Sequence, residues 1–258
     1  MPDFAKADPQ VVPRLLNDME QQGYAVIEGF LTDEQLQAAR AHVYHEVERH
    51  EHEYFALQGQ AAVKGSIFEQ MSVSPQVKDL FRQVYQGGIG QAPRSPEIFP
   101  ALRCLQGLTG KRESYYFHYD AAALTALIPL VTPSEGRYCG DFIFFPNLRN
   151  IRSNLYVNIL EKALMQNTLT QKLVTFAVKR GWLKPVTIKI VPGNAYFFWG
   201  YRSLHANEPC DPKALRSTVL LHYGEPHSRD NLASRLFLGW NFRRARISNE
   251  RTTRKDVG

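Results

Sequence analysis

The first part of the chain combines one strand-like run with helical patterns. The run "GYAVIEGFL" (residues 23–31) is apolar and bounded by glycine, which predicts a short strand. In the next stretch, "TDEQLQAARAHVYHEVERH", the apolar residues recur at helical spacing, and Thr32 and Gln35 form a capping-box pattern. A second helix is predicted over residues 75–85, ended by Gly87 and Gly88. We therefore expect a helical layer over about residues 1–100.

From about residue 101 the pattern changes to short apolar runs that Gly and Pro separate. The runs predicted as strands are "ALRCLQGL", "SYYFHYD", "LTALIPL", "GDFIFFP", "TIKIV", "NAYFFW" and "RSTVLLHY". Between the fourth and fifth runs, helical spacing returns at Leu169, Leu173, Phe176 and Ala177, and Gly181 follows as a stop. This order predicts a mainly β protein with flanking helices, whose core over residues 101–225 is a sandwich or barrel.

Length and composition are those of an ordinary globular protein. The 258 residues are 44% hydrophobic and 22% charged, and we expect one domain over residues 1–258. The longest apolar run, residues 121–131, is too short to span a membrane, and the first residues lack a secretory signal pattern. The three cysteines have no disulfide or zinc spacing, so a reduced, cytoplasmic protein is expected.

Positive charge is concentrated in two zones. The insertion over residues 149–189 has eight basic residues and one acidic residue, and the tail over residues 242–258 has six and two. Such zones favour an anionic substrate, an anionic membrane surface on the inner face, or an acidic partner. A solvated helix face and a loose tail would produce the same pattern. No phosphate-binding loop or RNA-binding aromatic motif is present, so no nucleic acid partner is expected.

The candidate chemistry begins with His118 and Asp120, one residue apart. On a strand both side chains would point the same way, together with Tyr116. A third ligand would come from elsewhere, and His205, after the aromatic run, is the best candidate. His222 competes with it, although it sits mid-strand. Two histidines and one carboxylate on one side of a metal leave positions open, as in non-haem Fe(II) oxygenases.

Eleven residues after His205, Arg216 begins a predicted strand, with Thr218 on the same face. A guanidinium beside a hydroxyl can clamp a carboxylate. This ordered set resembles the Fe(II)/2-oxoglutarate-dependent oxygenase superfamily, and "GYAVIEGFLTDEQLQAAR" is similar to its phytanoyl-CoA-hydroxylase-like branch. The resemblance implies a double-stranded β-helix (a cupin-like jelly roll), Fe(II), 2-oxoglutarate and O2.

The resemblance also implies roles for individual residues. His118, Asp120 and His205 would bind iron, and the carboxylate at position 120 favours hydroxylation over halogenation. Arg216 would hold the distal carboxylate of 2-oxoglutarate. The other candidates are Thr218, Asn207 and Tyr116 for the co-substrate, and Arg103, Gln106, Lys172, Lys179 and Arg180 for the substrate.

An anionic sugar, a lipid-linked sugar or an acyl-carrier conjugate would suit the basic zones, with hydroxylation at an unactivated C–H bond. Two alternatives stay open at this point. One is a cupin-like metalloenzyme that does not use 2-oxoglutarate, and the other is a non-catalytic jelly roll that binds a sugar or lipid.

Overall fold

The structure is a computed structural model that describes residues 10–134, 139–149 and 167–224. Four helices come before the main strands: α1 (Val11–Gln21), α2 (Asp33–Arg49), α3 (Ile67–Val73) and α4 (Pro75–Ile89). A 3-10 turn, η1 (Gln60–Val63), precedes α3, and two further helices, α5 (Gly107–Arg112) and α7 (Thr168–Lys179), lie within the β region. The described helices include none that is both long and apolar enough to cross a membrane.

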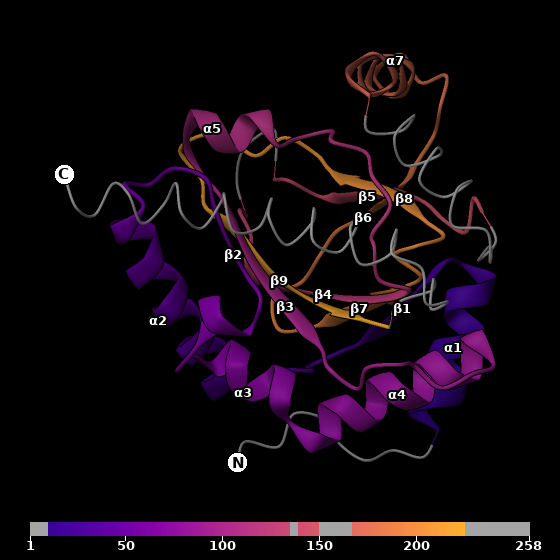
Figure 1. Ribbon diagram of the computed structural model, residues 1–258. Coiled ribbons are helices and arrows are strands. Elements are labelled where there is room, and N and C mark those ends of the chain that lie inside the picture. Colours follow the sequence, from indigo (N-terminus) through magenta and orange to yellow (C-terminus); the bar gives the residue numbers. More distant parts are fainter. Residues whose placement is uncertain (1–9, 135–138, 150–166, 225–258) are drawn as a thin grey trace, which may run out of the picture.

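Two antiparallel sheets form the centre of the molecule (Figure 1). The six-stranded sheet has the order β1-β7-β4-β9-β3-β2. Its strands are β1 (Tyr24–Ile27), β7 (Ala195–Phe198), β4 (Leu124–Val131), β9 (Arg216–Tyr223), β3 (Phe99–Leu105) and β2 (Phe55–Gln58). The three-stranded sheet has the order β6-β5-β8, from Val186–Ile188, Phe142–Phe145 and Leu204–Asn207. The predicted jelly roll with flanking helices is confirmed.

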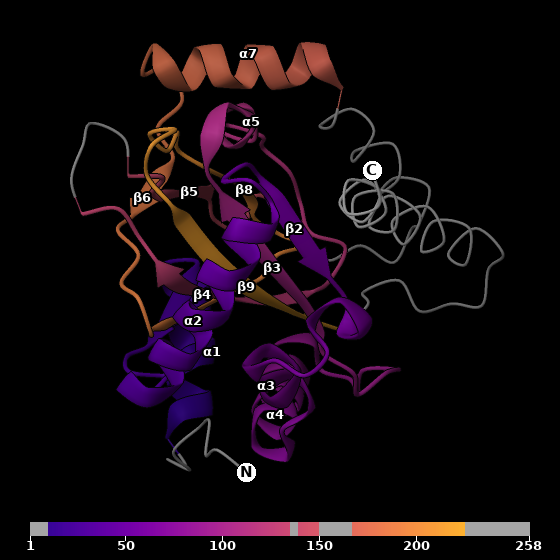
Figure 2. The same cartoon turned by 90° about the vertical axis from the view of Figure 1, so that its left-hand side faces the viewer.

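The core is layered because the central strands, such as β4 and β9, bury both of their faces. One face of the six-stranded sheet packs against α1 to α4, through Val219 and Leu221 of β9 and Phe68 and Phe81 of the helices. Its other face meets the three-stranded sheet, where Phe142 and Phe144 pack against Phe198. Helix α7 lies on the far side of the three-stranded sheet, at the top of Figures 1 and 2.

Helix boundaries follow local chemistry. The Thr32–Gln35 capping box at the start of α2 is confirmed. The predicted end of the second helix is wrong, because α4 continues through Gly87 and Gly88 and ends with Gly90 in the left-handed conformation. A Cβ at Gly88 would overlap the ring of Trp199, so this glycine serves close packing within the helix. The sequence pattern identified neither α1, α3 nor β2.

Candidate metal centre

His118 and Asp120 lie on an irregular segment that docks on β8. His118 exchanges two backbone hydrogen bonds of 3.0 Å with His205, and Asp120 N–H donates to Gly200 O at 3.0 Å. The strand predicted over residues 114–120 is wrong, since only His118 forms a β-bridge there, and Tyr115 has a φ of 55°. His205 was expected after the end of the aromatic strand, but it lies inside the separate strand β8.

In both histidine rings Nδ1 contacts a backbone carbonyl oxygen, and Nε2 does not. His118 Nδ1 lies 2.9 Å from Tyr116 O, and His205 Nδ1 lies 2.9 Å from Ser203 O. A carbonyl oxygen can only accept a hydrogen bond, so each Nδ1 carries the proton and donates it. The lone pair of each ring therefore lies on Nε2.

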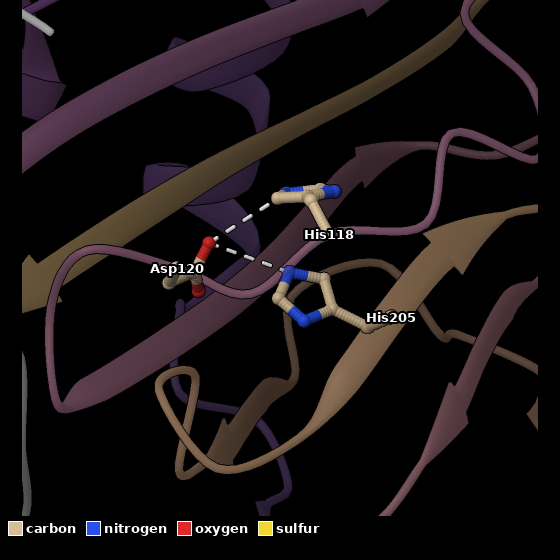
Figure 3. A group of neighbouring side chains, drawn as sticks. All are labelled: His118, Asp120 and His205. Carbon is tan, nitrogen blue, oxygen red and sulfur yellow. Dashed lines mark ion pairs between the residues drawn. The ribbon is translucent and has the colours of Figure 1, made fainter. Parts of the chain in front are cut away.

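The two Nε2 atoms converge on one oxygen of Asp120. Oδ1 lies 3.6 Å from His118 Nε2 and 3.4 Å from His205 Nε2 (Figure 3). Neighbouring ligands of an octahedral ion with bonds of about 2.1 Å lie about 3 Å apart, so small shifts would close these atoms around a metal. Among the described residues, these three form the group of potential ligands whose atoms lie within 4.8 Å of one another.

The other oxygen of Asp120, Oδ2, accepts a hydrogen bond on the side away from the two histidines. Thr125 Oγ1 donates to Oδ2 at 2.6 Å and lies 3.1 Å from His222 Nδ1. Since the threonine proton goes to the carboxylate, His222 Nδ1–H donates to the threonine oxygen. Gly200 completes this arrangement, because a Cβ there would overlap both the Asp120 carboxylate and the Thr125 hydroxyl. Thr125 and Gly200 orient Oδ1 toward the two histidines.

Burial and neighbouring charge set the protonation states. Burial, and then the electrostatic interaction with His205, lower the pKa of His118 to about 3. Burial alone would raise the pKa of Asp120, but the surrounding histidines, His205 foremost, hold that pKa well below its usual range. At neutral pH, His118 is a neutral imidazole and Asp120 is a carboxylate. Both are in the form that binds a divalent metal.

His222 does not take the place of His205. Its Nδ1 lies 3.8 Å from Oδ2 of Asp120, the oxygen that faces away from the two histidines. Burial lowers its pKa, so the ring is neutral near pH 7. It lines the same pocket as the potential ligands and supports Asp120 through Thr125. The geometry favours His205 as the third ligand.

The potential ligands line a pocket of about 250 Å³ between the two sheets. Strand alternation places Arg216, Thr218 and His222 of β9 on the pocket side, as the sequence pattern predicts. The predicted residues Arg103, Asn207 and Tyr116 also line the pocket. Arg103 lies opposite Thr218 in the β3–β9 pairing, so two arginines from neighbouring strands share one cavity.

Arg216 is a buried cation. It is 3% exposed, and its Nε has no hydrogen-bond partner among the described residues. Burial, followed by the like charge of Arg103, lowers the pKa of Arg216 to about 10, so it remains charged at neutral pH. Gly140, with a φ of 71°, makes room for it, since a Cβ there would lie 2.5 Å from Arg216 Cδ. A buried cation of this kind favours a bound anion.

The remaining candidates lie elsewhere. Gln106 does not line the pocket, and its buried Oε1 has no hydrogen-bond partner in the part of the chain that the structure describes. Lys172 and Lys179 of α7, and Arg180 just after it, are exposed and also lie outside the pocket lining. Arg149, counted in the basic insertion, is buried between the rings of Tyr119 and Tyr201 and adds no charge to the surface.

Sequence reasoning missed several residues of the pocket. Tyr54, Gln58 and Glu113 line it on the side of β2 and α5. Thr125 was visible as a hydroxyl within the apolar run "LTALIPL", and this buried polar position was the available signal. Gly200 and Gly140 carried no signal beyond being glycines near predicted strands.

No protein-family model matches the sequence, and no curated protein matches it either. Solved structures do match. A Pseudomonas putida prolyl-4-hydroxylase superposes with a TM-score of 0.54 at 10% identity, over 83% of this chain and all of that one. The non-haem α-ketoglutarate-dependent epimerase SnoN, from nogalamycin biosynthesis, superposes with a TM-score of 0.51 at 16% identity, over 83% and 82%.

SnoN has also been solved in complex with Fe³⁺, α-ketoglutarate and nogalamycin RO. That complex superposes with a TM-score of 0.53 at 15% identity, over 84% of this chain and 85% of that one. At these identities the likeness shows the fold. This chain has the double-stranded β-helix of these 2-oxoglutarate-dependent proteins, with a His-x-Asp and a distant His brought together inside it.

Proposed function

We propose that the protein is an Fe(II)/2-oxoglutarate-dependent oxygenase that hydroxylates an unactivated C–H bond of a small molecule. The observation that carries the proposal is the convergence of His118 Nε2, His205 Nε2 and Asp120 Oδ1 in a pocket that also holds Arg216. The fold is shared with a hydroxylase and with an epimerase that was solved with iron and α-ketoglutarate.

The donor set fits iron. Two imidazoles and one carboxylate on one side of a metal leave positions open for other ligands, which is the arrangement of non-haem Fe(II) oxygenases. Iron(II), with 2-oxoglutarate and O2, would supply the oxidising power for attack on the C–H bond. The chain would hold the ion through these three atoms, fix both ring orientations through the Tyr116 and Ser203 carbonyls, and restrain the carboxylate through Thr125.

The pocket also fits the co-substrate. A dicarboxylate that contacts the metal with one end needs a cation for its other end, and Arg216 offers a buried guanidinium in the same cavity. Thr218 lies two residues along β9 on the same face, and its hydroxyl can donate a hydrogen bond to the same carboxylate. Asn207 and Tyr116 line the same pocket and are further proposed contacts of 2-oxoglutarate. The side-chain amide of Asn207 already donates to Glu208 O at 3.0 Å.

The substrate proposed here is an anion. Arg103 is a second guanidinium in the pocket, and Glu113, at 3.8 Å, is a loose partner for it. An acidic group on the substrate would pair with Arg103 near the side of the pocket formed by Tyr54 and Glu113. Membership of the phytanoyl-CoA-hydroxylase-like branch and a single domain over residues 1–258 belong to the same proposal, and rest on the sequence pattern alone.

The test is a two-step anaerobic titration. Fe(II) is added first and 2-oxoglutarate second, while the visible charge-transfer band of the chelate is followed. Arg216→Gln should weaken 2-oxoglutarate binding by about ten- to a hundredfold and leave the iron affinity nearly unchanged, because a charge-assisted pair is lost away from the metal. Arg40→Gln is the matched control. Arg40 is half-buried and donates to Leu130 O outside the pocket.

Three results would contradict the proposal. Iron binding without 2-oxoglutarate binding would indicate a metalloenzyme of another kind, and no iron binding at micromolar concentrations would indicate a binding protein. An Arg216→Gln variant with wild-type 2-oxoglutarate affinity would remove this arginine from its assigned role.

A further inference from the structure

Helix α7 has two apolar faces, and only one of them is buried. Val174 and Val178 pack inward against the cluster formed by Phe117, Leu204 and their neighbours. Leu169, Leu173 and Phe176 are instead 65%, 60% and 45% exposed. Their spacing of four and three residues places these three side chains in one row along the helix. The row points outward, whereas a helix that only covers a core would present polar residues there.

The apolar row continues beyond the end of the helix. Trp182 is 73% exposed, and its ring meets that of Phe176 edge to face at 5.5 Å. Leu183 follows with 41% exposure. We call these five residues, Leu169, Leu173, Phe176, Trp182 and Leu183, the α7 surface. A contiguous exposed apolar patch of this kind marks an interaction site.

Positive charge borders the α7 surface. Residues 167–191 contain five basic residues and no acidic residue. Lys172 and Lys179 follow one edge of the row at the seven-residue spacing that returns to the same helix face. Arg180 stands at its end, with its guanidinium 5.2 Å from the centre of the Phe176 ring, and Lys184 follows Leu183.

This charge pattern decides between possible occupants. A second copy of the chain would bring two clusters of positive charge together across a symmetric contact, which disfavours a dimer here. The chain's own residues 225–258 contain eight basic and four acidic residues, so they offer no net negative charge to the α7 surface. An anionic surface satisfies both features at once, since it accepts the apolar row and neutralises the lysines.

We infer that the α7 surface docks on an anionic lipid surface. The helix would lie in the plane of the headgroups, with Leu169, Leu173 and Phe176 inserted and Trp182 at the polar boundary, where indole rings prefer to reside. Lys172 and Lys179 would contact the anionic headgroups along the edge. Figure 2 shows that α7 lies along one side of the molecule with no described element beyond it.

Docking would also bring the lipid close to the pocket. Tyr115 lies beneath the inner side of α7, where its ring is 5.0 Å from Lys179 Nζ and its carbonyl accepts from Thr175 Oγ1 at 3.4 Å. The next residue, Tyr116, lines the pocket. The docking site is separate from the metal ligands, so it goes beyond the proposed activity and stands or falls independently of it.

The experiment is sedimentation of the full chain with vesicles of phosphatidylcholine alone, or mixed with phosphatidylglycerol. The wild type should sediment with the mixed vesicles, and sedimentation should weaken between about 0.05 M and about 0.5 M NaCl as screening shortens the range of the charges. Leu173→Asp with Phe176→Asp should reduce vesicle affinity by about tenfold or more, because two inserted side chains become anionic. Both side chains are exposed, so folding should not depend on them.

Control variants distinguish binding through the apolar row from non-specific hydrophobic adsorption and from electrostatic attraction. Tyr44→Asp on α2 replaces another exposed aromatic, 52% exposed, and should leave sedimentation unchanged. Lys172→Gln with Lys179→Gln should weaken binding to the mixed vesicles and flatten its dependence on salt. Iron and 2-oxoglutarate titrations should be the same in the wild type and the Leu173→Asp, Phe176→Asp variant.

Three outcomes would overturn the inference. The wild type could remain in the supernatant at low salt. The double aspartate variant could sediment as well as the wild type, which would assign binding to the basic tail. Analytical ultracentrifugation could show that the wild type is a dimer and the double aspartate variant a monomer, which would make the α7 surface a contact between copies of this chain.

Discussion

At the scale of single residues, the proposed metal centre depends on groups that are not among its potential ligands. Thr125 is the clearest case, because its hydroxyl occupies Oδ2 of Asp120 and leaves Oδ1 for the metal. Without that hydrogen bond the carboxylate could rotate, and a buried oxygen would lose its partner.

Thr125→Val should therefore reduce Fe(II) affinity by about tenfold, the lower end of the range for partners that orient metal ligands. The change keeps the β-branched shape that a central strand prefers, but Asp120 Oδ2 and His222 Nδ1 lose the hydroxyl partner, so the metal-free protein should unfold below the wild-type temperature. Thr125→Ser should retain iron affinity, because it retains the hydroxyl. The measurement is anaerobic Fe(II) titration beside thermal unfolding of the metal-free variants, and an unchanged iron affinity for Thr125→Val would contradict the role.

The sequence identified the residues whose chemistry is unusual in itself. His118, Asp120, His205 and Arg216 stood out because metal ligands and a carboxylate clamp appear in order along predicted strands. Thr125 and Gly200 could not be identified in this way. Their roles depend on the β4–β9 register, which places Thr125 opposite His222, and on the approach of Gly200 to Asp120. Neither relation is visible in the order of the residues.

At the scale of elements, α7 supplies hydrogen bonds to the segment that carries His118 and Asp120, where a neighbouring strand would otherwise supply them. Gln171 Oε1 accepts from Phe117 N–H at 2.9 Å, and Gln171 Nε2 donates to Phe117 O. Phe117 directly precedes His118, so the side-chain amide completes the backbone pairing where the predicted strand is absent. A helix on the outside of the three-stranded sheet thereby holds the segment that carries His118 and Asp120.

Gln171→Ala should weaken Fe(II) binding by about tenfold and lower the unfolding temperature, because the backbone N–H and C=O of Phe117 each lose a hydrogen bond. Lys172→Ala is the matched control, since the neighbouring side chain points to solvent. Fe(II) titration and thermal unfolding of both variants are the measurements. If Gln171→Ala keeps wild-type iron affinity, α7 contributes only packing to this region.

The helices and strands were easier to predict than the irregular segment over residues 114–120. The helical spacing at residues 169–177 predicted α7, and alternation on β9 predicted which side chains share a face with Arg216. The strand over residues 114–120 was wrong because apolar and polar residues alternate there, while the backbone pairs with His205 at a single position. Periodicity reports which side chains are buried, and it does not report whether a neighbouring strand is available.

At the scale of the whole molecule, the site joins parts that are distant in sequence. His205 comes from the three-stranded sheet, Arg216 from the six-stranded sheet, and His118 and Asp120 from the segment that runs between α5 and β4. A metal and a dicarboxylate bound among them would connect both sheets. A β-sandwich or barrel was predictable from the succession of short strands, but the jelly roll and its pocket were predictable only through the likeness to a known family.

Ligands that bind only the folded state must raise its stability. At a hundred times its dissociation constant, a ligand adds about 2.7 kcal/mol, which for a chain of this size raises the unfolding temperature by about 5–10 °C. Fe(II), added without oxygen, should produce a rise of this order, and 2-oxoglutarate should add a second rise only when the metal is present. His205→Ala should lose both rises. Arg216→Gln should lose about half or more of the second, because its 2-oxoglutarate affinity falls by about ten- to a hundredfold. His222→Ala should keep the first, because its ring faces the other oxygen of Asp120. Calorimetry before and after addition of a chelator measures each step. A full metal-dependent rise in His205→Ala would show that the ion sits elsewhere.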